Sequence, residues 1–328
     1  MAGPTGTFSP MRFLTDAHVQ RLLPEPARCV ELAGEALRAL AEGRADVPPK
    51  PGVHLGAGSF ANAMPAAWPE RNLLGCKWIS IFPTNAKHSL PTASGLMVVN
   101  DAATGLPRCV MPAEALTAAR TAAVSGACIA ALAPEDGPVA ITGAGVQARS
   151  HLLVLDALGG TEVVVFARRA EAGDDLLDWA KRHTPNTSVR VVGSAHEAVD
   201  EAGVVVTALP IGLSGVQLDV AWVREDALLL PLDYASSVGP ELAASGALVA
   251  DHLPQFAAVR QAGGLPAAYP DPVGATGSLL GTGARRPAGR ITCQNLGNGL
   301  SDLVVAAAVA DSAEALDVGQ RLDPGGAA

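Results

Sequence analysis

The chain has 328 residues, of which 49% are hydrophobic and 17% are charged, and its formal net charge is −9. This balance is typical of a folded globular protein and excludes a disordered chain. The length predicts two domains. The acidic charge argues against a nucleic-acid partner, because contacts to phosphates need a basic surface.

The cysteines and the first residues bear on the cellular compartment. The five cysteines are scattered, odd in number and without a C-x-x-C pair. They predict small core residues in a reducing compartment and indicate neither a disulfide framework nor a metal site. The first ten residues lack the basic and apolar regions of a secretory signal, and no uninterrupted apolar run is long enough to span a bilayer. We therefore expect a cytoplasmic protein without a membrane partner.

The first part of the chain predicts helices on both sides of a group of strands, from apolar spacing and turn residues. In chain order we expect a helix starting after Thr15, a helix over 26–42, a turn-rich segment over 48–58, a strand over 73–82, strands over 95–100 and 107–111 joined by a hairpin loop, and a helix over 112–132. We expect Trp78, which lies in the strand over 73–82, to pack in the core.

From residue 139 the pattern changes to alternating strands and helices, which predicts a parallel, doubly wound sheet. The candidate strands are 139–142, 162–166, 189–192, 203–208, 228–232 and 247–251. Beyond them we expect a Gly- and Pro-rich surface loop over 269–290, an Ala-rich helix over 298–316 and a frayed tail over 323–326.

This order of elements predicts two domains of α/β class. A central Rossmann-type domain that binds NAD(P) is expected over 134–290. Residues 1–133 and 291–328, the two ends of the chain, are expected to fold together as a second, α+β domain.

A glycine turn follows the first strand of the alternating part. Gly143 allows the tight turn, Gly145 lets the backbone approach a pyrophosphate, and Ala148 keeps the next helix close to the strand. The helix begins at Val146 and Gln147, so its free N–H groups would face the phosphates. The alternative is an ordinary strand–helix turn.

The second strand of the alternating part bears on the choice of nicotinamide cofactor. An NAD site usually has an acidic side chain at the end of this strand, where it holds the ribose 2′-hydroxyl. Here Arg168 and Arg169 follow instead, and arginine pairs with a 2′-phosphate. The sequence favours NADPH, with NADH or NAD⁺ possible. The alternative is two solvated arginines at a helix start.

Three isolated charges stand out against apolar surroundings. Lys77 lies inside an apolar strand, Arg120 in an Ala-rich helix, and Asp233 after the strand 228–232, at the sheet edge where ligands of open α/β folds bind. Each alone is usually a solvated or ion-paired charge. Together with a nucleotide fold they indicate a substrate site.

The ordered motifs of the chain resemble the ornithine cyclodeaminase/mu-crystallin family. The matching motifs are Met64-Pro65-Ala66, Gly75-Cys76-Lys77-Trp78, Phe82-Pro83-Thr84-Asn85, Asn100-Asp101, Thr104-Gly105-Leu106-Pro107, Thr117 with Arg120-Thr121-Ala122-Ala123, the glycine turn, Asp233 with Gly239-Pro240-Glu241-Leu242, and Gly297 with Asp302. The resemblance implies homodimers, a dimerising substrate domain built from both chain ends, and a central Rossmann domain.

The resemblance also implies roles for single residues. Lys77 and Arg120 match positions that grip the substrate carboxylate, and Lys50 stands where several relatives have a substrate-binding arginine. Thr121 matches a cofactor-phosphate contact, and Asp233 matches the acid near the reacting amine. We expect Lys77 and Asp233 to be catalytic.

One strand-end residue and one loop are also expected near the cofactor. Thr207 is expected among the cofactor contacts. The resemblance brings the loop with Asn295, Gly297 and Asn298 near the nicotinamide.

One departure from the family pattern decides between functions. Many ornithine cyclodeaminases carry a glutamate two residues before the Met-Pro pair, and this chain has Asn62 there. Cyclisation with loss of ammonia needs additional proton transfers, so the departure weighs against it.

We therefore expect an NAD(P)H-dependent oxidoreductase acting on a small α-imino or α-amino acid, as an imine reductase or amino-acid dehydrogenase. The alternatives are an ornithine or lysine cyclodeaminase that uses NAD⁺ catalytically, and a non-catalytic NADPH-binding protein. The substrate side chain and the direction of the reaction stay open.

Overall fold

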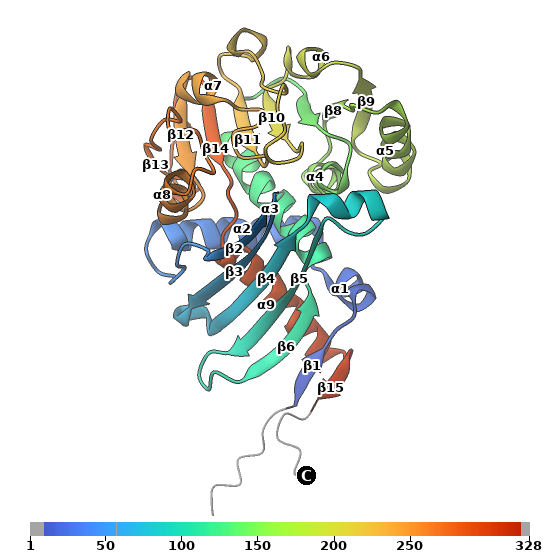
Figure 1. Ribbon diagram of the computed structural model, residues 1–328, viewed down its shortest axis with the longest axis vertical. Coiled ribbons are helices and arrows are strands. Elements are labelled where there is room, and N and C mark those ends of the chain that lie inside the picture. Colours follow the sequence, from blue (N-terminus) through green and yellow to red (C-terminus); the bar gives the residue numbers. More distant parts are fainter. Residues whose placement is uncertain (1–9, 57, 323–328) are drawn as a thin grey trace, which may run out of the picture.

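The structure is a computed structural model that describes residues 10–56 and 58–322. Within these ranges the strands form two separate sheets, which lie in the upper and lower halves of Figure 1. Helices α2 (Pro26–Ala41) and α3 (Glu114–Leu132) lie between the two halves in the same view. The expected tail over 323–326 lies outside the described residues.

The upper sheet is parallel throughout, in the order β13-β12-β14-β11-β10-β7-β8-β9. Its central strands are buried at every position and are apolar except for Thr142 and Thr207 at two strand ends, because helices cover both faces. This confirms the predicted doubly wound sheet. The strands are β7 (Val139–Thr142), β8 (Glu162–Phe166), β9 (Ser188–Val192), β10 (Val204–Thr207), β11 (Leu228–Pro231), β12 (Ala247–Ala250), β13 (Gly274–Ala275) and β14 (Ile291–Gln294).

The helical segments of this half follow the strands along the chain. They are α4 (Val146–Ala157), α5 (Ala170–His183), α6 (Ala195–Val199), η3 (Val220–Trp222), α7 (Pro240–Ala244), α8 (Leu253–Gln261) and η4 (Thr276–Leu279).

Two segments of this half differ from the sequence prediction. β14 pairs between β11 and β12, so the parallel sheet continues past the boundary expected at residue 290. The segment 269–290, expected as a surface loop, contains the buried residues Thr276 and Gly277. A Cβ on Gly277 would overlap the backbone carbonyl of Leu37, so the glycine allows the segment to pack directly on α2.

The lower sheet has the order β15-β1-β6-β5-β4-β3-β2. Its strands are β1 (Met11–Phe13), β2 (Gly52–Gly56), β3 (Ser59–Trp68), β4 (Leu73–Ile81), β5 (Ala93–Asp101), β6 (Pro107–Pro112) and β15 (Gln320–Leu322), with the short 3₁₀ segments η1 (Pro69–Arg71) and η2 (Pro83–His88). The sequence analysis had no strand at β3, and it assigned β2 to a turn-rich segment. Pro65 and the small residues of β3 hide its alternation.

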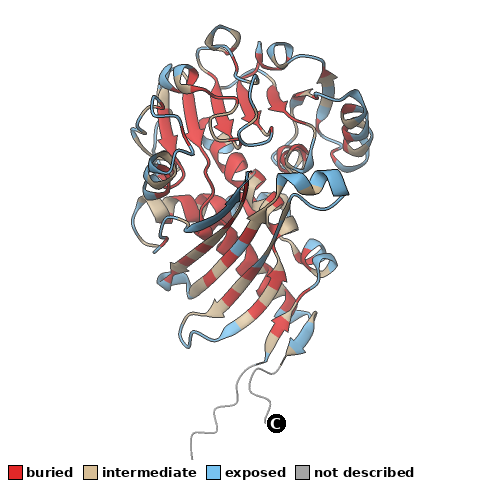
Figure 2. Ribbon diagram, viewed as in Figure 1, coloured by how far each residue is buried: buried red, intermediate tan, exposed pale blue. Residues whose placement is uncertain are grey.

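Helix α9 (Gly299–Ala315) covers one face of this sheet. The row Met64, Lys77, Met97 and Met111, in register across four strands, is buried on that side. The neighbouring row Ala63, Trp78, Leu96 and Pro112 alternates to the opposite face. Trp78 is 46% exposed, so the expectation that it packs in the core is wrong. Figure 2 shows exposed and half-buried residues along these strands.

The helices predicted for the chain ends are confirmed within one or two residues. α1 (Asp16–Leu22) starts at a capping box on Thr15. α3 is long and apolar enough to span a membrane by length and composition, although Arg120 interrupts it. More than half of its apolar window is buried against other elements, as in the core helix of a globular protein.

Candidate functional site

The glycine turn after β7 has the geometry of an anion-binding site. Gly143 has φ of 110°, and a Cβ there would lie 2.8 Å from the carbonyl oxygen of Ala208, so only glycine fits. Gly145 is exposed, with open space where a Cβ would stand, and it begins α4 without a side-chain cap. The first N–H groups of α4 are therefore free to bind an anion.

A cavity of about 770 Å³ opens in front of this turn. Gly143, Gly145, Val146 and Gln147 line it, and so do Arg168 and Arg169 after β8. Both arginines are exposed, and neither has an ion pair or a side-chain hydrogen bond within the described ranges. Ala148, in the first turn of α4, is fully buried, as a close contact between the helix and the strand requires. The open turn, the uncapped helix and the two available cations fit a dinucleotide phosphate chain.

A second cavity, of about 310 Å³, adjoins the first and shares Gln147 and the 208–211 loop with it. Lys50, Lys77, Arg120 and Thr121 all line this smaller cavity. Residues from the loop before β2, from β4 and from α3 thus meet beside the dinucleotide cavity. Thr117, one turn before Thr121, lies on the same face of α3 and also lines it.

Lys77 is the most deeply buried of these cations, with 1% of its surface exposed. Its Nζ donates to Asp302 Oδ1 at 2.7 Å and to Thr117 Oγ1 at 3.4 Å. The pKa of Lys77 is lowered to about 7, mainly by burial and also by the nearby cations Arg120 and Lys50, while Asp302 raises it. Lys77 can therefore gain and lose a proton near neutral pH.

Asp302 contacts two of these cations, Lys77 and Arg120. It is fully buried in the first turn of α9, where the helix dipole favours an acid. Arg120 Nε lies 2.8 Å from the same Oδ1 atom that Lys77 contacts, without the alignment of a hydrogen bond. One carboxylate thus faces two cations, and the guanidinium stays available for an anionic ligand.

Lys50 reaches the cavity from the other side. Its Nζ donates to the carbonyl oxygen of Leu296 at 2.6 Å and to the hydroxyl of Tyr234 at 3.3 Å. Tyr234 has φ of 60°, an unusual conformation for a tyrosine, which places its ring in the cavity wall. Lys50 has only neutral partners here, so its charge is not compensated within the site.

Asp233 and Thr207 do not line either cavity. Asp233 is fully buried, and its two oxygens accept from Thr207 Oγ1 at 2.7 Å and from Ser237 Oγ at 2.5 Å. Burial raises the pKa of Asp233, while these two hydroxyls lower it. Its chain neighbours Leu232 and Tyr234 do line the smaller cavity. The structure therefore places Asp233 behind the cavity wall and Thr207 against Asp233.

The loop between β14 and α9 forms another wall. Asp251 accepts from the backbone N–H groups of Leu296 and Gly297 at 3.2 and 2.9 Å and from the Asn298 amide at 3.3 Å. Asn298 also caps α9. Asn295 and Gly297 line the cavity, and both side-chain polar atoms of Asn295 are buried without a partner.

No aspartate or glutamate lines the smaller cavity within the described part of the chain. Asn62, on β3, lies in its wall. Among residues 10–56 and 58–322, no group of three His, Cys, Asp or Glu side chains has the arrangement of a metal site. The site is thus a cationic, mostly apolar pocket suited to a small carboxylate.

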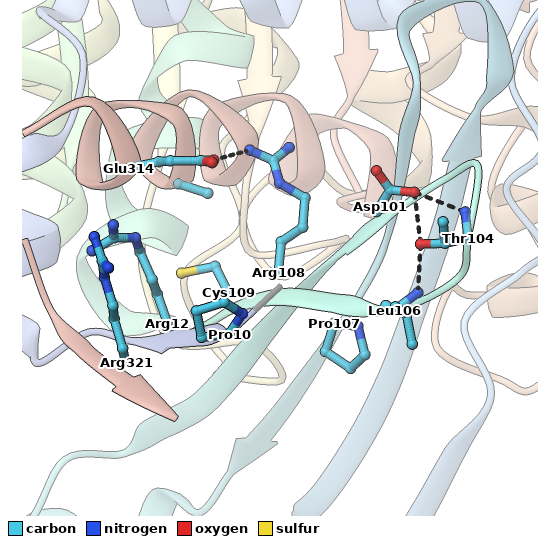
Figure 3. Close-up of a pocket in the computed structure, with 11 residues that line it drawn as sticks. Pro10, Arg12, Asp101, Thr104, Leu106, Pro107, Arg108, Cys109, Glu314 and Arg321 are labelled. Atoms are coloured by element: carbon cyan, nitrogen blue, oxygen red, sulfur yellow. Dashed lines mark hydrogen bonds and ion pairs between the residues drawn. The ribbon is translucent and has the colours of Figure 1, made fainter. Parts of the chain in front are cut away.

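A cavity of about 540 Å³ near β1 and β15, shown in Figure 3, has a different character. It also contains arginines, but each has an acidic partner. Arg12 and Arg321 both pair with Asp317. Arg108 pairs with Asp311 and with Glu314 on α9, and Figure 3 shows the pair with Glu314. Three acids thus face three arginines, so the charges around this cavity are balanced, unlike those of the smaller cavity.

The sequence analysis gave no role to Asp302 or Asp251. Asp302 is an acid inside a run of apolar residues, which is a signal of a buried, paired charge. Asp251 follows the buried strand β12, at the same sheet edge as Asp233. Only the fold shows that these acids face Lys77 and the 295–298 loop.

The chain is similar to known proteins in both sequence and structure. A family model described as the ornithine cyclodeaminase/mu-crystallin family matches residues 11–251. The chain is 32% identical over 319 residues to the nodulation efficiency protein NfeD of Rhizobium meliloti, covering 95% of this chain and 98% of that protein. It is 28% identical over 198 residues to a Delta(1)-pyrroline-2-carboxylate reductase of Bacillus cereus, covering 58% of this chain and 59% of the reductase.

A solved structure extends the likeness to the whole fold. An archaeal alanine dehydrogenase dimer with bound NAD is 25% identical in sequence and matches with a TM-score of 0.80. The match covers 95% of this chain and 98% of the dehydrogenase chain.

Proposed function

The chain belongs to the ornithine cyclodeaminase/mu-crystallin family, and from this premise we propose that it is an NAD(P)H-dependent oxidoreductase that interconverts a small α-imino acid and the corresponding α-amino acid. The relatives named above include a reductase of a cyclic imino acid and an amino-acid dehydrogenase with bound NAD. Both names describe the same change at a carbon–nitrogen bond.

One observation carries this proposal. Lys50, Lys77 and Arg120 line a small cavity that adjoins the dinucleotide cavity. A single buried carboxylate, Asp302, contacts Lys77 and Arg120, and Lys50 has no acidic partner within the described ranges. The uncompensated positive charge fits the carboxylate of an imino or amino acid, and Arg120 can form two parallel hydrogen bonds to it. The rest of the wall is mostly apolar.

We propose the following roles for the residues of the smaller cavity. Arg120 and Lys77 hold the carboxylate and so fix the reacting carbon beside the dinucleotide cavity. Lys77 can also exchange a proton near neutral pH, because its pKa is about 7. The dinucleotide, when bound, supplies or accepts the hydride.

We keep Asp233 in the proposal as the group that handles the proton of the substrate nitrogen, a role that requires its carboxylate to reach past the wall residues Leu232 and Tyr234. Its hydrogen bonds to Thr207 and Ser237 hold it just after the carboxyl end of β11. Substitution with asparagine keeps its shape and removes its charge. We expect Asp233→Asn to lower kcat more than it raises KM.

We propose NADPH as the preferred cofactor. The observation that favours it is the pair Arg168 and Arg169, which line the dinucleotide cavity and lack an acidic partner in the described ranges. Arginine side chains at the end of this strand suit a ribose 2′-phosphate.

The cyclodeaminase alternative fits the cavity less well. A diamino acid carries a second ammonium group, which needs an acidic partner when it is taken out of water. The cavity wall offers Asn62 and no carboxylate in the described part of the chain.

We further propose a homodimer formed through the face of the lower sheet opposite to α9. Trp78 and Leu96, directly paired across β4 and β5, are 46% and 45% exposed. With Ala63, Cys76, Val98 and Val110 they form an apolar surface, which we call the open sheet face. The alanine dehydrogenase of the same fold is a dimer, and a second copy would cover this face.

We also propose that the protein works in the cytoplasm. The cysteines of the described residues are free thiols, as expected in a reducing compartment.

The first experiment is to incubate the protein with NADPH or NADH and a panel of cyclic imines and of 2-keto acids with amines. Oxidation of the cofactor, followed at 340 nm, would support the reductase, with a loss of at least about tenfold in Lys77→Ala. Release of ammonia from ornithine or lysine without net absorbance change would support the cyclodeaminase. Cofactor binding without any turnover would support the non-catalytic protein.

A further inference from the structure

Asn295 carries a donor and an acceptor that nothing in the described structure satisfies. The residue is 8% exposed, lies in the wall of the smaller cavity, and both Oδ1 and Nδ2 are buried without a hydrogen-bond partner. A buried amide in this state is strongly disfavoured unless a ligand pairs with it. The amide therefore indicates a ligand that offers an acceptor and a donor close together.

The loop that carries Asn295 is fixed from behind. Asp251 accepts from the backbone N–H groups of the next two residues, Leu296 and Gly297. On the other side of Asn295, the side chain of Gln294 accepts from Tyr269 at 2.7 Å and donates to the carbonyl of Tyr234 at 3.3 Å. Asn295 thus sits between two anchored neighbours, which position its amide in the cavity wall.

The cations of the site lie next to the same loop. Lys50 Nζ donates to the carbonyl oxygen of Leu296, and a Cβ on Gly297 would lie 3.1 Å from a guanidinium nitrogen of Arg120. Gly297 has φ of 81°, so both its conformation and this close approach favour glycine. A carboxylate held by Arg120 and Lys77, with Lys50 nearby, would therefore lie beside the Asn295 amide.

We propose that Asn295 is a specificity-determining residue that binds the protonated imine nitrogen and one carboxylate oxygen of the substrate together. An α-iminium carboxylate has an N–H donor and a carboxylate oxygen on neighbouring atoms, which complements a primary amide at two points. A 2-keto acid presents two acceptors at the same place and leaves the amide oxygen unpaired. This inference rests on the proposed function, and it deepens it by naming the substrate form.

The nicotinamide carboxamide is the other group that could pair with an amide. Asn295 lines the cavity of Lys50, Lys77 and Arg120 and does not line the one that contains Arg168 and Arg169. The position beside the cations favours the substrate, and the test below separates the two ligands.

The test uses two planar, non-reducible carboxylates that differ at one atom. Pyrrole-2-carboxylate has an N–H beside its carboxylate, and furan-2-carboxylate has an oxygen acceptor in the same position. We would measure the Kd of each for the protein saturated with NADP⁺ by calorimetry. We expect the wild-type chain to prefer the pyrrole by at least about tenfold.

Three variants then locate this preference. Asn295→Leu removes both polar atoms and should reduce the preference to less than about twofold, with an unchanged Tm and NADP⁺ affinity. Asn295→Asp keeps the acceptor, so the pyrrole should stay preferred. The added negative charge should weaken the binding of both carboxylates by repulsion. Asn186→Leu removes an exposed amide that lines neither cavity and should leave the preference intact.

Several outcomes would overturn the inference. Equal binding of the two probes to the wild-type chain, or an unchanged preference in Asn295→Leu, would show that this amide does not recognise the N–H. Loss of NADP⁺ affinity in Asn295→Leu with the preference retained would assign the amide to the nicotinamide. Because the probes are not turned over, absence of imine reduction would count against the proposed function alone.

Discussion

Lys77 shows how burial turns an ordinary side chain into a titratable group of the site. Its pKa is lowered to about 7 mainly by burial, so the cation is lost as the pH rises through that value. A neutral Lys77 cannot hold a carboxylate by charge. We expect kcat/KM for the imino acid to fall above about pH 7 with a single ionisation.

The partner of Lys77 gives this prediction its control. Asp302 raises the pKa of Lys77, so Asp302→Asn should move the falling limb to lower pH. Lys181→Met removes an exposed lysine of α5 and should leave the profile where it is. A limb that does not move in Asp302→Asn would mean that another group titrates.

Arg168 and Arg169 carry the second prediction at the residue scale. Each charge-assisted hydrogen bond to a 2′-phosphate contributes about 1.5–3 kcal/mol. We expect Arg168→Ala combined with Arg169→Ala to raise the KM for NADPH at least about tenfold and to change that for NADH little.

A matched arginine is available for comparison. Arg190, on the adjacent β9, is exposed and already paired with Glu162 at 3.3 Å. Arg190→Ala should leave the ratio of the two cofactors unchanged. Equal losses for NADPH and NADH in the double variant would remove the argument for a 2′-phosphate contact.

At the scale of elements, a buried histidine joins the two halves of the molecule through α3 and α4. His151 on α4 is 1% exposed, with Nδ1 2.7 Å from the carbonyl oxygen of Gln147 and Nε2 2.9 Å from Ser125 Oγ on α3. A carbonyl only accepts, so Nδ1 carries the proton of the neutral ring and Nε2 accepts from the serine. The histidine therefore links the dinucleotide half to α3.

This contact predicts a pH-dependent stability. Burial lowers the pKa of His151 to about 4 from an ordinary 6.5, so the unfolded chain binds the proton more readily. The stabilisation is complete above pH 6.5 and is lost as the pH falls towards 4, by roughly 3 kcal/mol in total. Denaturant unfolding at pH 7 and at pH 4.5 should show most of this loss.

The same measurement on variants separates His151 from other groups. His151→Gln should be less stable at pH 7 and should lose less stability on acidification than the wild-type chain. His196→Gln, which removes a half-exposed histidine, should keep the wild-type difference. His252, whose pKa burial also lowers, contributes equally to the wild-type chain and to both variants.

The elements also show where sequence patterns stop being informative. Strong alternation of apolar strands and helices predicted β7, β8, β10, β11 and β12, because strands buried on both faces are continuously apolar. β3 was missed because it contains a proline and small residues, and its neighbours on both sides supply its pairing. β14 was missed because only the fold shows that a short segment after a Gly-rich stretch pairs between β11 and β12.

At the scale of the whole molecule, the open sheet face predicts the assembly. Burying an exposed Trp or Leu side chain contributes about 1.5–3 kcal/mol, and each subunit offers both. We expect Trp78→Glu combined with Leu96→Lys to convert a dimer into a folded monomer, seen by light scattering with size-exclusion chromatography.

The control is an apolar residue exposed elsewhere. Val273 is 77% exposed and lies in the other half of the chain, so Val273→Lys should keep the wild-type mass. A wild-type monomer, or a dimer that survives both charges at Trp78 and Leu96, would exclude this face as the contact.

The sequence by itself determined the parallel, doubly wound sheet, its glycine turn and the family of the chain. These features follow from local patterns: apolar runs, the glycines that a tight turn needs, and ordered motifs. It also indicated Lys77 and Arg120, since isolated charges in apolar segments are rare, and it indicated Lys50 through the family resemblance.

Only the tertiary structure decided how these charges are balanced and what the cavity wall contains. Asp302, 225 positions from Lys77, and the loop with Asn295 meet the cations through packing that joins distant segments. The same packing places Asp233 and Thr207 behind the wall. Contacts between remote parts of a chain depend on the complete fold, so no local pattern could state them.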